Sequence, residues 1–525
     1  MESPVSRVRL AAANMATRLT LTMVTVLAGF ISTPLLLLWI GKDALGAFTV
    51  AQGWLGLIGI LELGFASAFS AVFASCLAVG DRERLLQVMA YSIRVYLGIA
   101  LVMVLAGTLI YVWIAGLMKA APGLTGDLGR GVLIGAVSIS FIAATPFRVL
   151  LDAQQRGAFI NLLLLMQAMV SMVAALAFAW LRWGIVGQFL ALGVGSAMFA
   201  VAVTVECLRH YPEMRLNVLW AKPDAATRTS IWRISWKLSV NNLASRLGVL
   251  TDGLVIGKFL SATQFVPYTI TRKLGDIYQG QLANIGNATW AALAELHAQD
   301  RRQLFNRRVV EITSLIGVAS IAGLLPIAIY NKAFVSLWVG PSYYGGDLLS
   351  LAFLANAFLF CVWSFWAWVV TAVGKVDGLM STNVAMLLIN LPLTVGATWA
   401  LAPHHPQLAL CGPLLGNIAG FLAIGVWRMV LLLNRHFGIG VGTLHRALWS
   451  APLLALPYLS LSWWLSRTFP PSNWMTLAIS MALSAAGYAG LAWLVILDGE
   501  QKLLMRSVAA HAMVPLLRKM QARRA

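Results

Sequence analysis

Charged residues are scarce in this chain of 525 residues, since Asp, Glu, Lys and Arg make up only 11% of it. A soluble domain usually has about 25%. Hydrophobic residues make up 60%, and long apolar runs recur from end to end. Each run has roughly the 20 residues that cross a bilayer, and the runs are too rich in Gly, Ala and Leu for a membrane β-barrel. The composition therefore predicts an all-α polytopic membrane protein.

Cysteine is rare as well, because only Cys76, Cys207, Cys361 and Cys411 occur, all in or beside apolar runs. No CxxC pair and no neighbouring His cluster accompanies them, which argues against a disulfide framework, a metal site or a cofactor. The basic start of the chain has no short apolar core followed by a cleavage site. We therefore predict no removable signal peptide.

Hydropathy and charge interruptions predict about 14 transmembrane helices. Most Lys and Arg residues fall in the loops on one side, so the net charge of +19 is explained by the positive-inside rule and not by nucleic-acid binding. We predict that the protein lies in the inner (plasma) membrane of the cell. The basic loops indicate the cytoplasmic side and place the N-terminus there, and an even number of spans then places the C-terminus on the same side. The outer loops are short, none much above about 15 residues, and offer no room for a catalytic domain. We predict a protein that is not an enzyme.

Two sequence motifs recur at nearly the same spacing. WIGKDALGAFTV (Trp39–Val50) matches VIGKFLSATQFVPYTI (Val255–Ile270) at an offset of 216 residues, and GDRERLLQ (Gly80–Gln87) matches QDRRQLFN (Gln299–Asn306) at 219. Two matches in order, at equivalent span boundaries, predict two parallel six-helix lobes related by an axis along the membrane normal, a known plan of transporters.

This repeat divides the chain into four parts. We expect an N-lobe with spans 1 to 6 (residues 1–208), a cytoplasmic amphipathic linker (209–237), a C-lobe with spans 7 to 12 (238–437), and two C-terminal spans with a basic cytoplasmic tail (438–525). The tail is amphipathic and is expected to lie on anionic lipid.

Polar side chains form a stripe along the seventh span, Leu238–Phe259, and along the eighth, Val266–Leu296, when each is placed at about 100° per residue. The residues singled out on these stripes are Asn242, Arg246 and Asp252 on the seventh span and Arg272, Lys273, Asp276, Asn284 and Asn287 on the eighth. With a rise of about 1.5 Å per residue along each helix, Arg246 lies at about the same depth in the membrane as Asp276, and Asp252 at about the same depth as Arg272. Each of these two residue pairs could therefore form an ion pair.

Each charge at the bilayer centre costs about 2.5–3.5 kcal/mol on the mildest scale, so these charges must face one another or water. One interpretation is a set of ion pairs that join two helices. The other is a hydrated central cavity with a small cationic excess. Lys273 has no acidic partner in the two spans, and polarity continues at every turn, which favours the cavity.

Glu62 and Arg18 leave alternatives open. Glu62, in LELGFASAF, could couple transport to a proton or sodium gradient, or it could cap a helix break at Gly64 or bond a neighbouring helix. Arg18 lies near the inner end of the first span, where it could reach the lipid headgroups or line the cavity and its interface.

The segment Thr33–Gln87 resembles the opening of the polysaccharide-biosynthesis (O-antigen/lipid-linked oligosaccharide) flippases of the multidrug/oligosaccharidyl-lipid/polysaccharide exporter superfamily. It has IGK at the end of the first span, ELG inside the second and a basic GD loop after it. LTDGLVIGKF and FVSLWVGPSYYGGDLL in the second half agree with this. The resemblance implies a MATE-like V-shaped bundle of two lobes that alternates between inward-open and outward-open states. It also implies a cationic cavity for a lipid-linked diphosphate, with Arg246, Arg272 and Lys273 as the matching cations.

Three functions follow as hypotheses. The first is a flippase that moves a polyprenyl-diphosphate-linked oligosaccharide across the membrane for cell-surface O-antigen, capsule or exopolysaccharide synthesis, in contact with membrane lipids and with a polysaccharide polymerase. Asp252 and Asp276 would hold the cations in place. The second is an ion-coupled multidrug exporter of the same fold, in which the acids dominate. The third, a membrane glycosyltransferase, would need an exposed catalytic loop, and the short outer loops argue against it.

Overall fold

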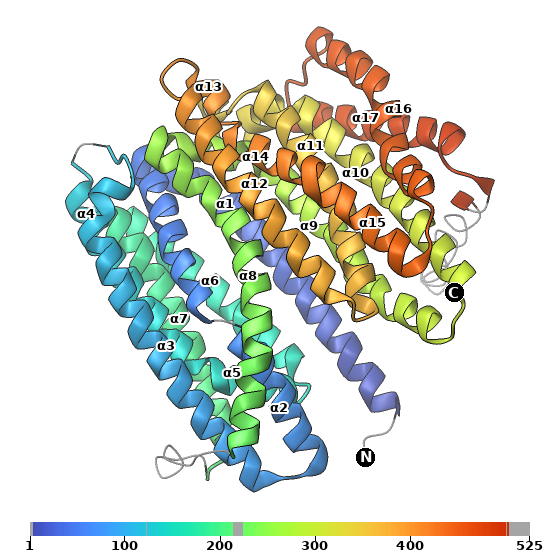
Figure 1. The fold of residues 1–525 in the computed structure, drawn as a ribbon. Coiled ribbons are helices and arrows are strands. Elements are labelled where there is room, and N and C mark those ends of the chain that lie inside the picture. The colour runs from blue at the N-terminus through green and yellow to red at the C-terminus, as the bar shows by residue number, and fades with distance from the viewer. Residues whose placement is uncertain (1–3, 63, 122, 214–223, 500, 503–525) are drawn as a thin grey trace, which may run out of the picture. The chain divides into compact units, whose positions relative to one another are not determined.

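The computed structural model describes residues 4–62, 64–121, 123–213, 224–499, 501 and 502, and the regular elements in these residues are all helices (Figure 1). The chain forms two compact units. The first comprises Met1–Val266 with Thr398–Pro413, and the second comprises Pro267–Ala397 with Leu414–Ala525. Each unit is described by itself.

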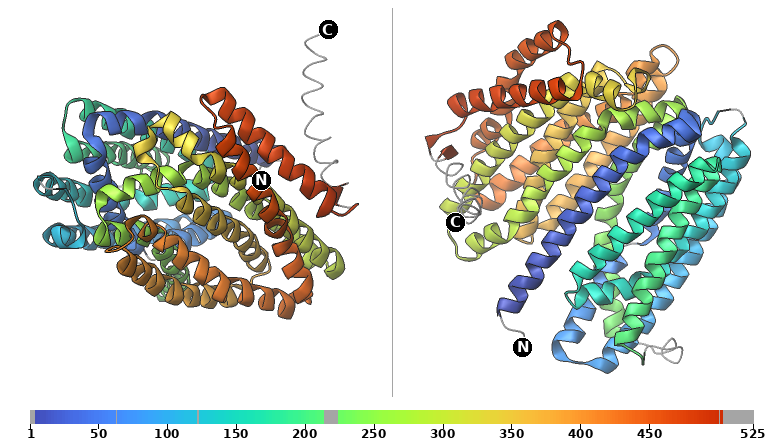
Figure 2. Two further views of the ribbon diagram at one scale, coloured as in Figure 1. Left: turned by 90° about the horizontal axis from the view of Figure 1, so that it is seen from above. Right: turned by 180° about the vertical axis from the view of Figure 1, so that it is seen from behind.

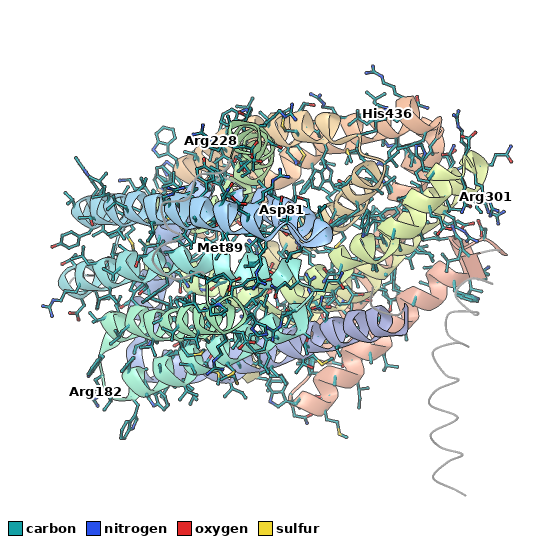
Figure 3. All side chains as sticks on the ribbon, turned by 90° about the horizontal axis from the view of Figure 1, so that it is seen from below. Asp81, Met89, Arg182, Arg228, Arg301 and His436 are labelled. Carbon is teal, nitrogen blue, oxygen red and sulfur yellow. The ribbon has the colours of Figure 1, made fainter. Side chains whose placement is uncertain are left out.

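The first unit holds the helices of the N-terminal half. In chain order they are α1 (Pro4–Ile58), η1 (Gly59–Glu62), α2 (Phe65–Val79), α3 (Arg82–Leu117), α4 (Thr125–Ile139), η2 (Ser140–Ala144), α5 (Thr145–Ala153), α6 (Gly157–Trp180), α7 (Gly184–His210) and α8 (Ala225–Phe259). α6 packs against both α1 and α7, and α4 packs against α7. Figure 3 shows Asp81, before α3, and Arg182, after α6, at opposite ends of this unit.

Two expected spans run through one element, α1. They meet at Gly41, whose φ of 81° lies in a region that favours glycine, and the helix kinks there. The expected second span then breaks again: η1 follows α1, Gly64 has φ 67°, and α2 begins at Phe65. The expected second span is therefore two helical pieces joined at Glu62–Gly64.

α8 begins before the membrane segment predicted for it. Asp224 caps the helix by accepting a hydrogen bond from the Thr227 amide at 3.0 Å. Hydrogen bonding with the Thr227 side chain, and to a lesser extent with its amide, lowers the pKa of the Asp224 carboxyl. Residues 225–237, expected in the linker, are thus the first turns of the seventh span. Within them Ile231 is buried while Trp232 and Trp236 are exposed, as in an amphipathic helix. Residues 214–223 of the expected linker lie outside the described residues.

The second unit holds the remaining helices, apart from α13. They are α9 (Ala262–Ala298, which begins in the first unit), α10 (Arg302–Trp338), η4 (Pro341–Tyr343), α11 (Asp347–Ala372), α12 (Val376–Leu401, which ends in the first unit), α14 (Gly412–Gly420, which also begins there), η5 (Phe421–Gly425), α15 (Val426–Phe437), α16 (Val441–Thr468) and α17 (Trp474–Val495); α13 (Pro406–Ala409) belongs to the first unit. α10 is the most buried of the apolar helices and packs against α11, α16 and α17 (Figure 2). Buried bonds fix it, such as that from Trp366 Nε1 to Thr313 Oγ1 at 3.0 Å.

Ten helical segments among the described residues are long and apolar enough to cross a bilayer, so the chain is a multi-pass membrane protein. One of them covers the continuous α1 and η1, which together hold more than one expected span. α8, α9 and α16 are long but fall outside the ten, and α8 and α9 carry the charged stripes that lower their hydropathy. The count of 14 spans therefore stays a prediction.

Candidate substrate-binding site

Arg272 on α9 lies within a ring of contacts in the second unit. Its Nη2 is 3.2 Å from the carboxylate of Asp276, and its Nη1 donates to the hydroxyl of Tyr268 at 2.5 Å. The guanidinium carbon lies 5.0 Å from the centre of the Tyr268 ring and 5.1 Å from that of Phe353. Tyr268, Arg272 and Asp276 are four residues apart, so one face of the helix brings them together.

These contacts hold the guanidinium in one place without neutralising the whole face. A planar guanidinium stacked on aromatic rings is pre-organised for a carboxylate or phosphate. Lys273 follows directly and is partly buried, and among the described residues it has no ion-pair partner. Asn284 is exposed further along α9, while the side chain of Asn287 lies outside the described part of the helix. The α9 face therefore carries two cations and one carboxylate, a site suited to an anion.

The predicted ion pairs have different outcomes. Asp276, which depth alone matched with Arg246, makes its ion pair with Arg272 on its own helix. The side chains of Asn242 and Arg246 are outside the described part of α8, so their roles stay predictions. Asp252 is buried, only 5% exposed, on α8 of the first unit. Because Arg272 belongs to the other unit, the pairing of Asp252 with Arg272 also stays a prediction.

A buried hydrogen-bond network anchors α9 beside Arg272, and sequence reasoning missed it. The Thr271 carbonyl accepts from Asn331 Nδ2 at 2.7 Å, and the Thr271 hydroxyl accepts from the Gly345 amide at 2.8 Å. The Asn331 amide also donates to Ser350 Oγ at 3.0 Å. Tyr344 contacts Ser350 at 3.1 Å. These residues come from α10, α11 and the loop between them, so the network fixes the level of α9 within the second unit.

Glu62 lies where the expected second span breaks. Its Oε1 accepts a hydrogen bond from the Tyr96 hydroxyl of α3 at 3.0 Å, and Gly64 is two residues away. The predicted bond of Glu62 to a neighbouring helix is therefore present, and a break occurs at Gly64, whereas capping of that break by Glu62 stays a prediction. Arg18 is exposed on α1, which is compatible with either of its expected positions.

A glutamine at position 62 separates the structural role from ion coupling. The amide oxygen of Glu62→Gln still accepts the Tyr96 hydrogen bond but cannot take up a proton. We expect this variant to keep wild-type transport and the same response to an imposed proton or sodium gradient, measured in proteoliposomes. Tyr96→Phe is the matched control for the loss of the bond. A variant Glu62→Gln that transports but ignores the gradient would instead assign coupling to this carboxylate.

In the first unit, the part of α1 just after its kink contacts the start of α9, and the segment after α3 bonds to the end of α8 and the start of α9. The charge pattern predicts that these contacts lie on the outer side. Thr263 Oγ1 donates to Asp43 Oδ1 at 2.6 Å. The backbone of Lys119 bonds to both Gly257 O, at 2.8 Å, and Ala262 N, at 3.0 Å. A Cβ at Gly46 would lie 2.3 Å from the Ala262 carbonyl oxygen, so the backbones touch there. The two copies of the repeated motif therefore pack on each other.

Comparisons with known proteins support the fold. No protein-family model matches the sequence, and no curated protein is similar to it in sequence. Among solved structures, one of the lipid II flippase MurJ in an inward closed conformation is similar, with a TM-score of 0.68, 12% identity, and coverage of 93% of this chain and 99% of that one. An inward-facing multidrug resistance transporter of the MATE family, in the MOP superfamily, has a TM-score of 0.62, 15% identity and coverage of 80% and 99%.

A third similar structure is a MOP-superfamily transporter from Pyrococcus furiosus, described as having a binding pocket of reverse polarity. Its TM-score is 0.55 at 14% identity, and the match covers 81% of this chain and 95% of that one. At such identities the likeness shows a shared fold. The chain therefore has the helical fold of MOP-superfamily transporters, as the MATE-like bundle expected from the sequence requires.

Proposed function

We propose that this protein is a flippase that carries a polyprenyl-diphosphate-linked oligosaccharide across the inner membrane by alternating access, for the assembly of a cell-surface polysaccharide. The observation that carries the proposal is the fixed Arg272 on α9 with Lys273 beside it. Both cations lie on a helix that a lipid-facing role would have made apolar. Charge-assisted hydrogen bonds from them to a diphosphate are the strong kind.

The coverage of the similar structures supports the same choice. The lipid II flippase structure matches 93% of this chain, whereas the multidrug transporter structure matches 80%. The difference is about as long as the C-terminal segment that contains α16 and α17. This supports the proposal of a lipid-linked passenger, with its head group inside the protein and its lipid tail in the bilayer.

The alternative, an ion-coupled exporter of cationic drugs, has one specific observation in its favour. Asp252 is a buried carboxylate in the C-terminal part of α8, and a buried carboxylate can bind a cation or a proton. In this alternative Asp252 and Glu62 would carry the function and the α9 cations would be dispensable. A polymerase partner and coupling to a proton or sodium gradient are further parts of the flippase hypothesis.

A transport assay with purified protein distinguishes these functions. In proteoliposomes we expect the protein to move a fluorescent polyprenyl-diphosphate oligosaccharide between leaflets, measured by the fraction accessible to a quencher or a sugar-cleaving enzyme added outside. The matched control is the same lipid with a neutral linkage in place of the diphosphate, which should not move. Transport of a cationic dye without transport of the diphosphate lipid would reject the flippase in favour of the exporter.

A further inference from the structure

A cavity lies in the second unit where α10 and α16 both end, at the side that the charge pattern places outside. Its volume is about 470 Å³, and it is bounded by the last turns of α10, the end of α16 and the turn that leads to α17. The lining is mixed, with Leu337, Pro470 and Pro471 among its apolar residues and Lys332, Asp347 and Arg467 as its charged residues. The lining does not include Arg272 or Lys273, although Asp347 of the lining bonds Tyr344, which belongs to the network that anchors Thr271.

The charges of the cavity favour a single negative charge. Lys332 and Arg467 supply two positive charges, and Asp347 supplies one negative charge that forms an ion pair with Arg467. Asp347 is also committed to the Tyr344 hydroxyl, which donates to it at 2.8 Å. Burial raises the pKa of Tyr344, so the phenol stays protonated as a donor. With the carboxylate occupied, the cavity is left with a net charge of about +1, which a phosphodiester would balance.

Arg467 is held for such a role. Its guanidinium carbon lies 5.1 Å from the centre of the Trp463 ring, and about half of its side chain is exposed. Stacking and the ion pair with Asp347 fix the plane of the guanidinium while other N–H groups stay accessible. Lys332 is exposed on α10, one helical turn before Ser336, whereas Arg467 is on α16.

Aromatic side chains place the cavity at the level of lipid headgroups. Trp464 near the end of α16, Phe469 in the turn after it and Trp474 at the start of α17 are exposed, each more than half accessible. Trp474 also packs edge-on against Phe334 of α10, with ring centres 5.9 Å apart. Exposed aromatic residues at the end of a membrane helix are typical of the interface between hydrocarbon and water. A ligand in this cavity would therefore be part of a lipid and would be bound beside the bilayer.

We propose that this cavity binds the phosphodiester headgroup of an anionic phospholipid in the outer leaflet, with Lys332 and Arg467 as the phosphate ligands and the apolar wall of Leu337, Pro470 and Pro471 against the glycerol. The site is separate from the transported substrate, so it does not depend on the identity of that substrate. It gives α16 and α17, the spans outside the internal repeat, a role of their own.

Native mass spectrometry of the full-length protein tests the site. We expect the wild type to retain phosphatidylglycerol in preference to phosphatidylcholine. The double variant Lys332→Gln/Arg467→Gln should lose about a hundred-fold in affinity for phosphatidylglycerol, because it removes two charge-assisted bonds to phosphate that are each worth roughly a factor of ten. The matched control Arg302→Gln/Lys375→Gln removes two exposed cations of the same unit away from the cavity and should bind as the wild type does.

The remaining outcomes overturn the proposal. Equal retention of phosphatidylglycerol by the wild type and the double variant would show that the cavity is not the site. Equal retention of phosphatidylcholine would remove the role of charge, and binding of inorganic phosphate without lipid would make the site one for a free anion. Displacement by a polyprenyl diphosphate would assign the cavity to the transported substrate. If the double variant does not fold, Lys332→Gln alone decides, since this exposed side chain has no bond among the described residues.

Discussion

Arg272→Ala/Lys273→Ala is expected to reduce translocation of a diphosphate-linked lipid at least about a hundred-fold, because it removes two charge-assisted donors that are each worth roughly a factor of ten. Arg272→Lys should fall between this variant and the wild type. It keeps the charge but loses the planar guanidinium that stacks on Tyr268 and Phe353. Initial rates in proteoliposomes measure the effect, and surface polysaccharide measures it in cells.

The matched control for this variant is Arg301→Ala/Arg302→Ala, which removes two adjacent cations from the same unit. Both are exposed at the turn between α9 and α10, and Arg301 is seen at that end of the unit in Figure 3. This control should transport at the wild-type rate, and both proteins should reach the membrane in equal amounts. Normal translocation by Arg272→Ala/Lys273→Ala would refute the proposed phosphate site.

Asp276 provides a check in the opposite direction. It accepts the ion pair of Arg272, so a neutral Asp276→Asn leaves the α9 face more positive. A site for a diphosphate should tolerate this change, whereas a site for a cationic drug should be weakened by it. The same pair of variants, at positions 272 and 276, therefore separates the flippase from the exporter by the sign of the charge that matters.

The helices and the polar face of α9 could be predicted from the sequence because both depend on local periodicity. Arg272, Lys273 and Asp276 share a face through helical spacing alone. The pair Arg272–Asp276 was equally local, since a separation of four residues favours it, but matching residues by depth suggested Arg246 instead. Tyr268 lies four residues before Arg272, so the same helical spacing indicates a contact between these two side chains.

Other parts of the site had no local signal. Phe353 reaches Arg272 from α11, and Asn331 reaches Thr271 from α10, through packing between distant segments. Tyr96 of α3 likewise donates its hydrogen bond to Glu62 of η1, a different helix. The kink at Gly41 was visible only as a boundary between two expected spans, because hydropathy cannot tell a kinked helix from two separate helices. Tertiary contacts of this kind cannot be predicted from local sequence patterns, because they depend on how distant segments pack together.

The contact between the two repeated motifs in the first unit gives the second large effect. If transport requires this contact to open, a covalent link between Asp43→Cys and Thr263→Cys should stop translocation almost completely, and a reductant should restore it. The native side chains are hydrogen-bonded at 2.6 Å, so oxidation or a short bis-thiol reagent can join the two thiols. The four native cysteines are buried and should not compete for the reagent.

A cross-link at the other end of the same unit is the matched control. Arg82 and Glu213 form an ion pair at 2.6 Å between the start of α3 and the segment after α7, and Arg82→Cys/Glu213→Cys should be cross-linked without loss of transport. Gly46→Val supplies independent evidence without any reagent. Its Cβ would lie 2.3 Å from the Ala262 carbonyl oxygen, so the repeated motifs could not close on each other and transport should fail. Full activity of the cross-linked Asp43→Cys/Thr263→Cys protein would mean that this contact stays closed throughout the cycle, and that the passenger leaves by another route.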